Sequence, residues 1–149
     1  MIDYLKPRLF EPLKVEGARW DSNPDDINLG GWGLYVKTED MAKFGQLLIQ
    51  KGKWDGKQLL PEAWIEEATT SKILQDPNVE PAKSDSDWHQ GYCYQIWQCR
   101  HNGFRADGRD GQFIVMLPEQ KAVVILTANI GDMQAELNLI WEYLLPALK

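Results

Sequence analysis

The fold is decided by residues 103–128, which read GFRADGRDGQFIVMLPEQKAVVILTA. Apolar residues alternate or run together over short lengths there, and glycines or other turn-forming residues separate the runs. This pattern predicts extended stretches at 103–108, 112–117 and 122–128. A preceding segment, residues 91–98, is rich in aromatic side chains and is also predicted to be a strand. The three stretches from residue 103 onward predict an antiparallel three-strand meander, which residues 91–98 precede.

The last predicted strand, residues 122–128, is apolar on both faces, which is typical of a strand inside a sheet. No further strand is predicted after it, so its outer edge should be unpaired. An unpaired apolar edge favours association with another strand. We therefore expect residues 122–128 to pair with a second copy of the chain or with a strand on a piece of protein that the chain lacks.

Three helices accompany the meander. The first begins at Thr38, interpreted as its N-cap, and ends at Gly52. A second starts at Pro61, and a C-terminal helix is capped by Asp132. Each has apolar residues three and four positions apart, which is typical of a helix with one buried face.

The order of these elements predicts the α+β class. We expect a single domain over residues 1–149, in which residues 1–87 form a helical-lobe and loop part and residues 88–149 form the three-strand meander and the C-terminal helix. Within the first part, residues 1–30 are predicted to be rich in loops, and residues 75–87 to form a polar loop.

Composition excludes several classes of protein. The 149 residues carry a formal net charge of −6, and neither half is basic, so no nucleic-acid partner is expected. No apolar run reaches the ~20 residues of a membrane span. The N-terminus lacks the pattern of a signal peptide, and the sequence predicts no particular compartment. The spacing of Cys93 and Cys99 fits neither a redox pair nor a zinc site.

Few residue patterns point to metal or cofactor chemistry, and we expect neither a metal nor a cofactor. His89 and His101 are the only histidines, so a site with three histidine ligands is impossible. Asp85, Asp87 and His89 can be drawn as a mixed site, but a capped polar loop is the favoured interpretation. No serine lies in a G-x-S-x-G elbow, and no phosphate-binding G-x-x-x-x-G-K motif occurs.

Seven tryptophans give the chain many candidate aromatic surfaces. Trp64 and Trp141 lie on apolar helical stripes and are predicted to belong to the core. Trp88 and Trp97 flank the polar loop and the first strand, where they either line a groove or pack inside the protein. The glycines of residues 107–111 (DGRDG) form either an anion cradle or a tight turn.

Taken in order, four stretches resemble the serine beta-lactamase and penicillin-binding-protein family, in particular its esterase- or peptidase-like branch. They are residues 9–13 (LFEPL), residues 30–47 with GGWGL and EDMAKFGQL, residues 52–61 (GKWDGKQLLP), and residues 107–129 with DGRDGQ and MLP. The resemblance covers nearly the whole chain. It implies a hydrolase that acylates a serine.

The chain departs from that family in the residues that carry the chemistry. The family's nucleophile lies in an S-x-x-K motif and is followed by Y-x-N or Y-x-S, and neither motif occurs here. The family's third motif aligns with Ala106, Asp107 and Gly108, and Ala106 lacks the cationic or imidazole group expected at that position. The resemblance implies that the backbone N–H of Arg109 is one of two oxyanion donors. The side chain of Arg105 or Arg109 would have to replace the missing charge, unless each is a solvated surface residue.

The resemblance thus implies the C-terminal portion of a serine hydrolase that is inactive alone and supplies the third-motif strand. Ala106, Asp107, Gly108 and Arg109 are the expected substrate-binding residues, and no catalytic residue is expected in this chain. The substrate of the complete enzyme would be a small ester, amide or peptide. The alternative is a non-catalytic module that binds through an aromatic groove or through its strand edge.

Overall fold

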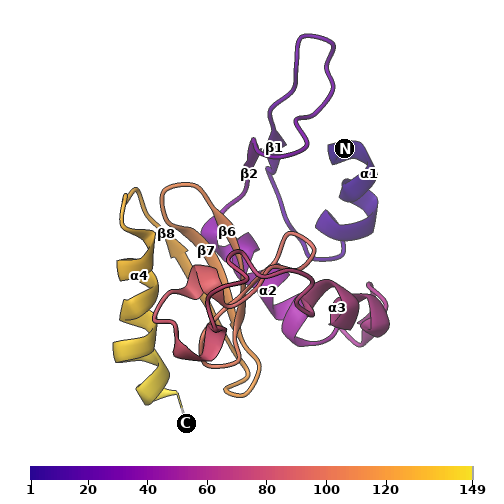
Figure 1. Ribbon diagram of the computed structural model, residues 1–149. Helices are drawn as coiled ribbons and strands as arrows, with labels where there is room; N and C mark the ends of the chain where they lie inside the picture. The colour runs from indigo at the N-terminus through magenta and orange to yellow at the C-terminus, as the bar shows by residue number, and fades with distance from the viewer. Residues whose placement is uncertain (149) are drawn as a thin grey trace.

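The computed structural model describes residues 1–148, and its elements are drawn in Figure 1. The helices are α1 (Ile2–Leu5), α2 (Thr38–Ile49), α3 (Glu62–Thr69) and α4 (Met133–Leu139). The strands are β1 (Arg19–Trp20), β2 (Leu34–Tyr35), β3 (Lys53–Trp54), β4 (Lys57–Gln58), β5 (Trp97–Gln98), β6 (Phe104–Gly108), β7 (Gln112–Leu117) and β8 (Ala122–Thr127). The chain is therefore α+β, as its sequence predicts. No described helix is long and apolar enough to cross a membrane.

The main sheet is antiparallel, with the strand order β5-β6-β7-β8. Strands β6, β7 and β8 confirm the predicted meander. Residue Phe113 of β7 lies between Asp107 of β6 and Leu126 of β8. The first strand is much shorter than predicted, because β5 contains only Trp97 and Gln98.

The prediction of a strand over residues 91–98 is wrong for its first part. Tyr92 makes isolated bridges to Ile73 and Trp97, and the chain then reverses. Gln95 adopts a left-handed conformation with φ of 58°, and the Cys93 N–H donates to the Ile96 carbonyl at 2.8 Å. Extended backbone cannot continue through that turn, whatever the β propensity of the aromatic residues.

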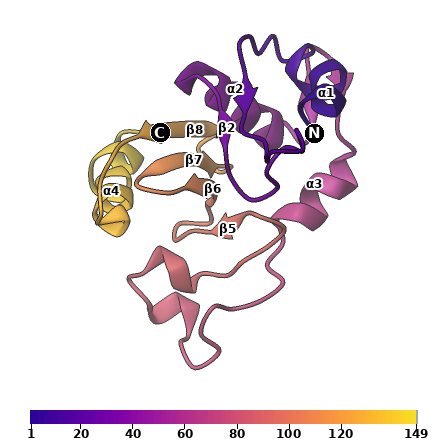
Figure 2. The same ribbon diagram turned by 90° about the horizontal axis from the view of Figure 1, so that it is seen from above.

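Helices α2 and α4 lie on opposite sides of the sheet (Figures 1 and 2). Alternate side chains of β7 point to opposite faces, so one strand supplies two cores. Phe113, Val115 and Leu117 pack with α4 and the segment after it. Ile114 and Met116 pack on the side of α2 and α3. The buried strand β7 therefore joins the two apolar clusters.

Strand β8 is the last strand of the sheet and pairs only with β7 among the described residues. Most of its side chains are half-buried, from Ala122 to Leu126. The edge position that the sequence predicts for residues 122–128 is thus confirmed.

The helices match the sequence prediction only in part. Residues 1–30 are not loop throughout, because α1 continues into a wide helical turn at Lys6–Phe10. Thr38 is the first residue of α2 rather than its N-cap, which is Lys37. Asp132 caps α4 as predicted, since its side chain accepts a hydrogen bond from the Ala135 N–H at 3.0 Å.

The two tryptophans predicted to lie in the core have different surroundings. Trp141 is 7% exposed and belongs to the α4 cluster, as expected. Trp64 is 51% exposed, so its prediction is wrong. Its helix, α3, is short and buries only Ile65, and the Trp64 ring stacks on Tyr94 at the surface.

Candidate functional site

An open cleft of about 890 Å³ lies at the end of β6. One wall contains Ala106, Asp107, Gly108 and Arg109, the four residues singled out in the sequence. The opposite wall is the segment from residue 31 to residue 36, which precedes α2. Segments about seventy residues apart in the chain therefore meet at this cleft.

Hydrogen bonds to neighbouring backbone hold the second wall in place. The Trp20 indole donates to the carbonyls of Leu29 at 2.8 Å and Trp32 at 3.2 Å, and the Asp21 N–H donates to Gly33 at 2.9 Å. Gly33 has a φ of +90°, and a Cβ there would lie only 2.9 Å from the Cβ of Asp21. A glycine is needed at this position for both reasons. The Trp32 side chain itself is 70% exposed in the cleft.

The wall formed by β6 ends in a tight turn to β7. Gly108 pairs with Gln112, and Gly111 turns the chain with a φ of +91°. This part of the DGRDG motif is thus a tight turn, one of its two sequence interpretations. The carbonyl of Gly111 accepts from the Ala128 N–H at 3.0 Å, which ties the turn to the segment after β8.

Arg109 is the first residue beyond β6 and has two distinct polar parts. Its backbone N–H has no hydrogen-bond acceptor among residues 1–148. Its side chain is 92% exposed and its Nε lies 3.3 Å from an Asp110 carboxylate oxygen. Such a surface ion pair contributes little to stability. The guanidinium therefore matches the solvated alternative, and the backbone N–H is the free donor.

Arg105 lies on the opposite side of β6 from Ala106 and is fully buried. Its Nη1 donates to the carbonyls of Asp87 at 3.2 Å and Gln98 at 3.0 Å. Its Nε donates to Asp107 Oδ2 at 3.2 Å. This residue is neither a solvated arginine nor a free charge in the cleft.

Burial raises the pKa of the Asp107 carboxyl, and the nearby Arg105 charge and a hydrogen bond from Trp97 act in the opposite direction. Asp107 is thus a carboxylate that β6 holds against a buried cation beside the cleft.

Trp88 and Trp97 do not form an open groove. Their rings meet edge to face with centroids 5.3 Å apart, and both are half-buried. The Arg105 guanidinium lies 4.3 Å from the Trp88 ring and 5.5 Å from the Trp97 ring. These tryptophans pack around the arginine, as the core-packing interpretation expects.

The drawn metal site over Asp85, Asp87 and His89 does not assemble. Asp87 is fully buried and accepts hydrogen bonds from Arg100, Gln134 and Trp141. His89 instead contacts Ser84 through Nδ1 at 2.8 Å. Among residues 1–148 no three histidine, cysteine, aspartate or glutamate side chains are grouped to hold a metal ion.

The cleft contains no group that is an obvious nucleophile or base. None of the residues that line it is a serine, cysteine, histidine or lysine. Cys93 and Cys99 are buried and free, and burial raises the pKa of Cys99 to about 12. Such a thiol is inert at neutral pH. What the cleft offers is backbone N–H groups and an exposed indole, because the Asp107 side chain points with that of Arg105 to the other face of β6.

The chain has a beta-lactamase-like fold, as the four sequence stretches predict, and two solved structures confirm this fold. One, described as "Putative 6-aminohexanoate-dimer hydrolase from Bacillus anthracis", has a TM-score of 0.69 and 23% identity over 97% of this chain. A second, described as "Crystal structure of putative beta-lactamase from Bacteroides dorei DSM 17855", has a TM-score of 0.61 and 10% identity over 85% of this chain. The chain spans 38% and 44% of their respective lengths.

No family model matches the chain, and no curated protein matches it.

Proposed function

We propose that the cleft at the end of β6 is one wall of an acyl-transfer site, and that the chain acts as the C-terminal portion of a serine hydrolase. In this proposal β6 is the third-motif strand. The serine and lysine of the S-x-x-K motif come from a segment outside this chain. The observation that carries the proposal is the free backbone N–H of Arg109, at the rim of the cleft that all four expected residues line.

A backbone N–H at this position suits the chemistry of acyl transfer. Attack on an ester or amide carbonyl places negative charge on the carbonyl oxygen, and a donor fixed in advance stabilises that charge without reorganisation. The β6–β7 turn supplies such a donor on a rigid hairpin. A single oxyanion donor contributes roughly 10²–10³ in rate.

The residues that line the cleft favour an uncharged group beside the reacting carbonyl. Ala106 offers no cation to a substrate carboxylate, and the Arg105 guanidinium is buried behind the strand. The Arg109 guanidinium is 92% exposed and lies beside the Asp110 carboxylate, which offsets its charge. A neighbour in fold is described as a hydrolase of the 6-aminohexanoate dimer. We therefore propose esters or amides as substrates, rather than compounds that need a carboxylate anchor.

The isolated chain tests the first part of this proposal. We expect no burst of product from an activated ester such as p-nitrophenyl acetate and no acyl adduct by mass spectrometry, because the cleft lacks a nucleophile. A covalent adduct on one of the chain's own serines would contradict the proposal. Reading the coding DNA before Met1 tests the second part, since it should encode S-x-x-K and then Y-x-N in frame.

A second candidate function rests on the free edge of β8. This strand pairs only with β7 among the described residues, and its six residues include no charge and no proline that would protect the edge. We propose that β8 pairs with another strand, from a second copy or from the segment that carries the nucleophile. Sedimentation over a range of concentrations, with hydrogen exchange of residues 122–127, tests this. Monomers at every concentration would count against self-pairing.

A further inference from the structure

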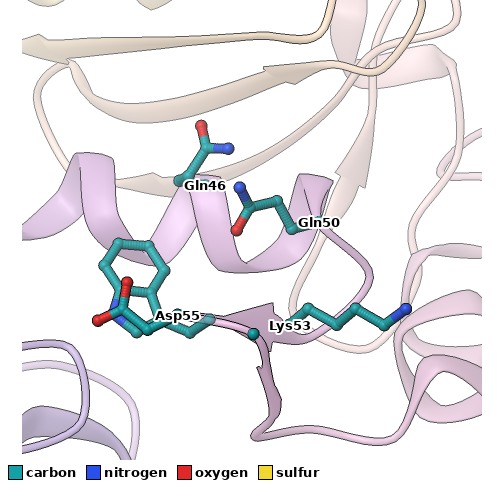
Figure 3. A pocket seen from close by; sticks show the side chains of 6 residues that line it. Gln46, Gln50, Lys53 and Asp55 are labelled. Atoms are coloured by element: carbon teal, nitrogen blue, oxygen red, sulfur yellow. The ribbon is translucent and has the colours of Figure 1, made fainter.

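A second hollow, of about 710 Å³, lies away from the β6 cleft, between α2 and the β3–β4 hairpin (Figure 3). It is lined by Gln46, Gln50, Lys53, Trp54, Asp55 and Gly56. None of these residues lines the β6 cleft. The function proposed above therefore does not use this hollow.

Most polar side chains that line the hollow make no hydrogen bond to another residue among residues 1–148. Gln46 and Gln50 are one helical turn apart, so both amides project from the same side of α2, as Figure 3 shows. Neither amide has a hydrogen-bond partner among residues 1–148, and the same holds for the Asp55 carboxylate and the Trp54 indole N–H. By contrast, the nearby Gln58 amide is satisfied by the carbonyls of Lys51 and Leu60.

The hairpin that carries Trp54 and Asp55 is a rigid support. Asp55 and Gly56 have φ values of 46° and 76°, the two left-handed residues of a two-residue hairpin turn. Trp54 pairs with Lys57 on the returning strand. The Leu59 N–H donates to the Gly52 carbonyl at 2.9 Å, which fixes the hairpin to the end of α2. The backbone that carries the Trp54 ring is thus fixed relative to the end of α2 without a ligand.

The charge of the hollow is set by Asp55. Figure 3 shows the Lys53 ammonium pointing away from the two glutamines. The Lys53 charge also lowers the pKa of Glu62, on α3, which places the ammonium on that side of the hairpin. A single carboxylate facing the hollow disfavours an anionic ligand.

We propose that this hollow binds an uncharged sugar. A pyranose ring has an apolar face of C–H groups that packs on an indole, and a rim of hydroxyls that both donate and accept hydrogen bonds. Trp54 supplies the apolar surface. Gln46 and Gln50 supply amide groups that donate and accept, and Asp55 accepts only. Small-molecule binding sites usually combine an apolar or aromatic surface with a few polar groups.

The test follows the indole N–H resonance of Trp54 by NMR while the whole chain is titrated with cellotetraose and with chitotetraose at up to millimolar concentration. We expect a saturable shift of the Trp54 resonance with at least one of the two sugars, and none with glucuronate. No saturable shift with either tetrasaccharide, or equal binding of glucuronate, would overturn the proposal.

Variants assign the binding to this hollow. Their affinities for the same two tetrasaccharides are measured by calorimetric titration, because Trp54→Ala lacks the indole resonance. Trp54→Ala should weaken the binding about tenfold or more, and Gln50→Ala about fivefold, as expected for the loss of an aromatic contact and of one neutral hydrogen bond. Gln50 is exposed at the end of α2, so its variant should fold even if Trp54→Ala does not. Trp32→Ala, in the β6 cleft, is the matched control and should bind normally. Unchanged binding by Gln50→Ala and Trp54→Ala, or loss of binding in Trp32→Ala, would contradict the assignment.

Discussion

The buried guanidinium of Arg105 donates to the carboxylate of Asp107 at 3.2 Å, two residues further along β6. Alternate residues of a strand share a face, so the strand itself brings this cation and anion together. Trp88 and Trp97 cover the arginine, and the next residue after Asp107 is the glycine at the cleft. The ion pair therefore belongs to the structure that holds the end of β6 in position.

Replacing Arg105 with alanine should destabilise the protein strongly. The variant leaves Asp107 without its partner and leaves a gap between the two tryptophans, and breaking a buried pair costs about 3–5 kcal/mol. Urea denaturation measures this loss. Arg109→Ala is the matched control, because its exposed side chain should change stability by no more than about 0.5 kcal/mol. Equal stabilities of the two variants would show that Arg105 does not support the strand.

The buried Asp87 should make stability sensitive to acid. Burial by itself raises the pKa of its carboxyl, but hydrogen bonds from Gln134, Trp141 and Arg100 outweigh burial and lower the pKa. The folded protein then binds this proton less readily than the unfolded chain. The stabilisation is complete above the unfolded pKa of about 3.9 and is lost as pH falls through the folded-state pKa.

Asp87→Asn tests this effect in urea denaturation from neutral to acid pH. The variant should be less stable at neutral pH, and the loss relative to the natural protein should shrink in acid. Asp107→Asn is the control with the opposite sign. Since the pKa of Asp107 is raised, its contribution is present below the unfolded pKa and is lost as pH rises through the folded-state pKa. If the free energies of unfolding of Asp87→Asn and the natural protein differed by the same amount at every pH, the role assigned to Asp87 would be contradicted.

Gly45 lies where α2 packs directly against the sheet. A Cβ there would lie 2.5 Å from Val123 Cγ1 and 2.7 Å from Ile114 Cγ2. Gly45→Ala, a change that favours an ordinary helix, should therefore destabilise this protein by about 1–3 kcal/mol. Val123→Ala should make room for the new methyl group, so the double variant should be more stable than the sum of the two single effects predicts. Strict additivity in thermal or urea denaturation would count against this contact.

The two thiols should be protected in the folded protein. Burial raises the pKa of Cys93 and raises that of Cys99 to about 12, so neither is a thiolate at neutral pH. Both should react with a chromogenic disulfide reagent only as fast as the protein unfolds. The labelling rate of the protein unfolded in urea is the reference for the labelling rate of the native protein. Rapid labelling of the native protein would contradict this account.

The sequence predicts those elements whose structure depends on residues within a single segment. The apolar run of residues 113–117 and that of residues 122–126 are properties of single strands, and both strands form as predicted. The predicted strand at residues 91–98 does not form over its first part, because the left-handed Gln95 reverses a segment that is rich in strand-favouring aromatic residues. Propensity gives no signal for that turn.

In the candidate site, too, only the features that depend on a single segment could be predicted from the sequence. Residues 106–109 could be singled out from motifs within one segment. The burial of Arg105 could not, because it depends on Trp88 and Trp97, which other parts of the chain bring to it. The second wall of the cleft was also missed. Residues 31–36 lie about seventy residues before β6 in the chain, and only the fold shows that they line the same cleft.

In the proposed acyl-transfer site, the Arg109 backbone N–H stabilises the oxyanion of the reaction. The most direct test measures kcat/KM for ester hydrolysis in the polypeptide that joins this chain to the coding sequence before Met1. Arg109→Pro removes the N–H, and Arg109→Ala keeps it while removing the same side chain. We expect Arg109→Pro to lower kcat/KM by roughly 10²–10³, and Arg109→Ala to keep a kcat/KM close to that of the natural protein. Equal activities of the two variants, both correctly folded, would contradict this role.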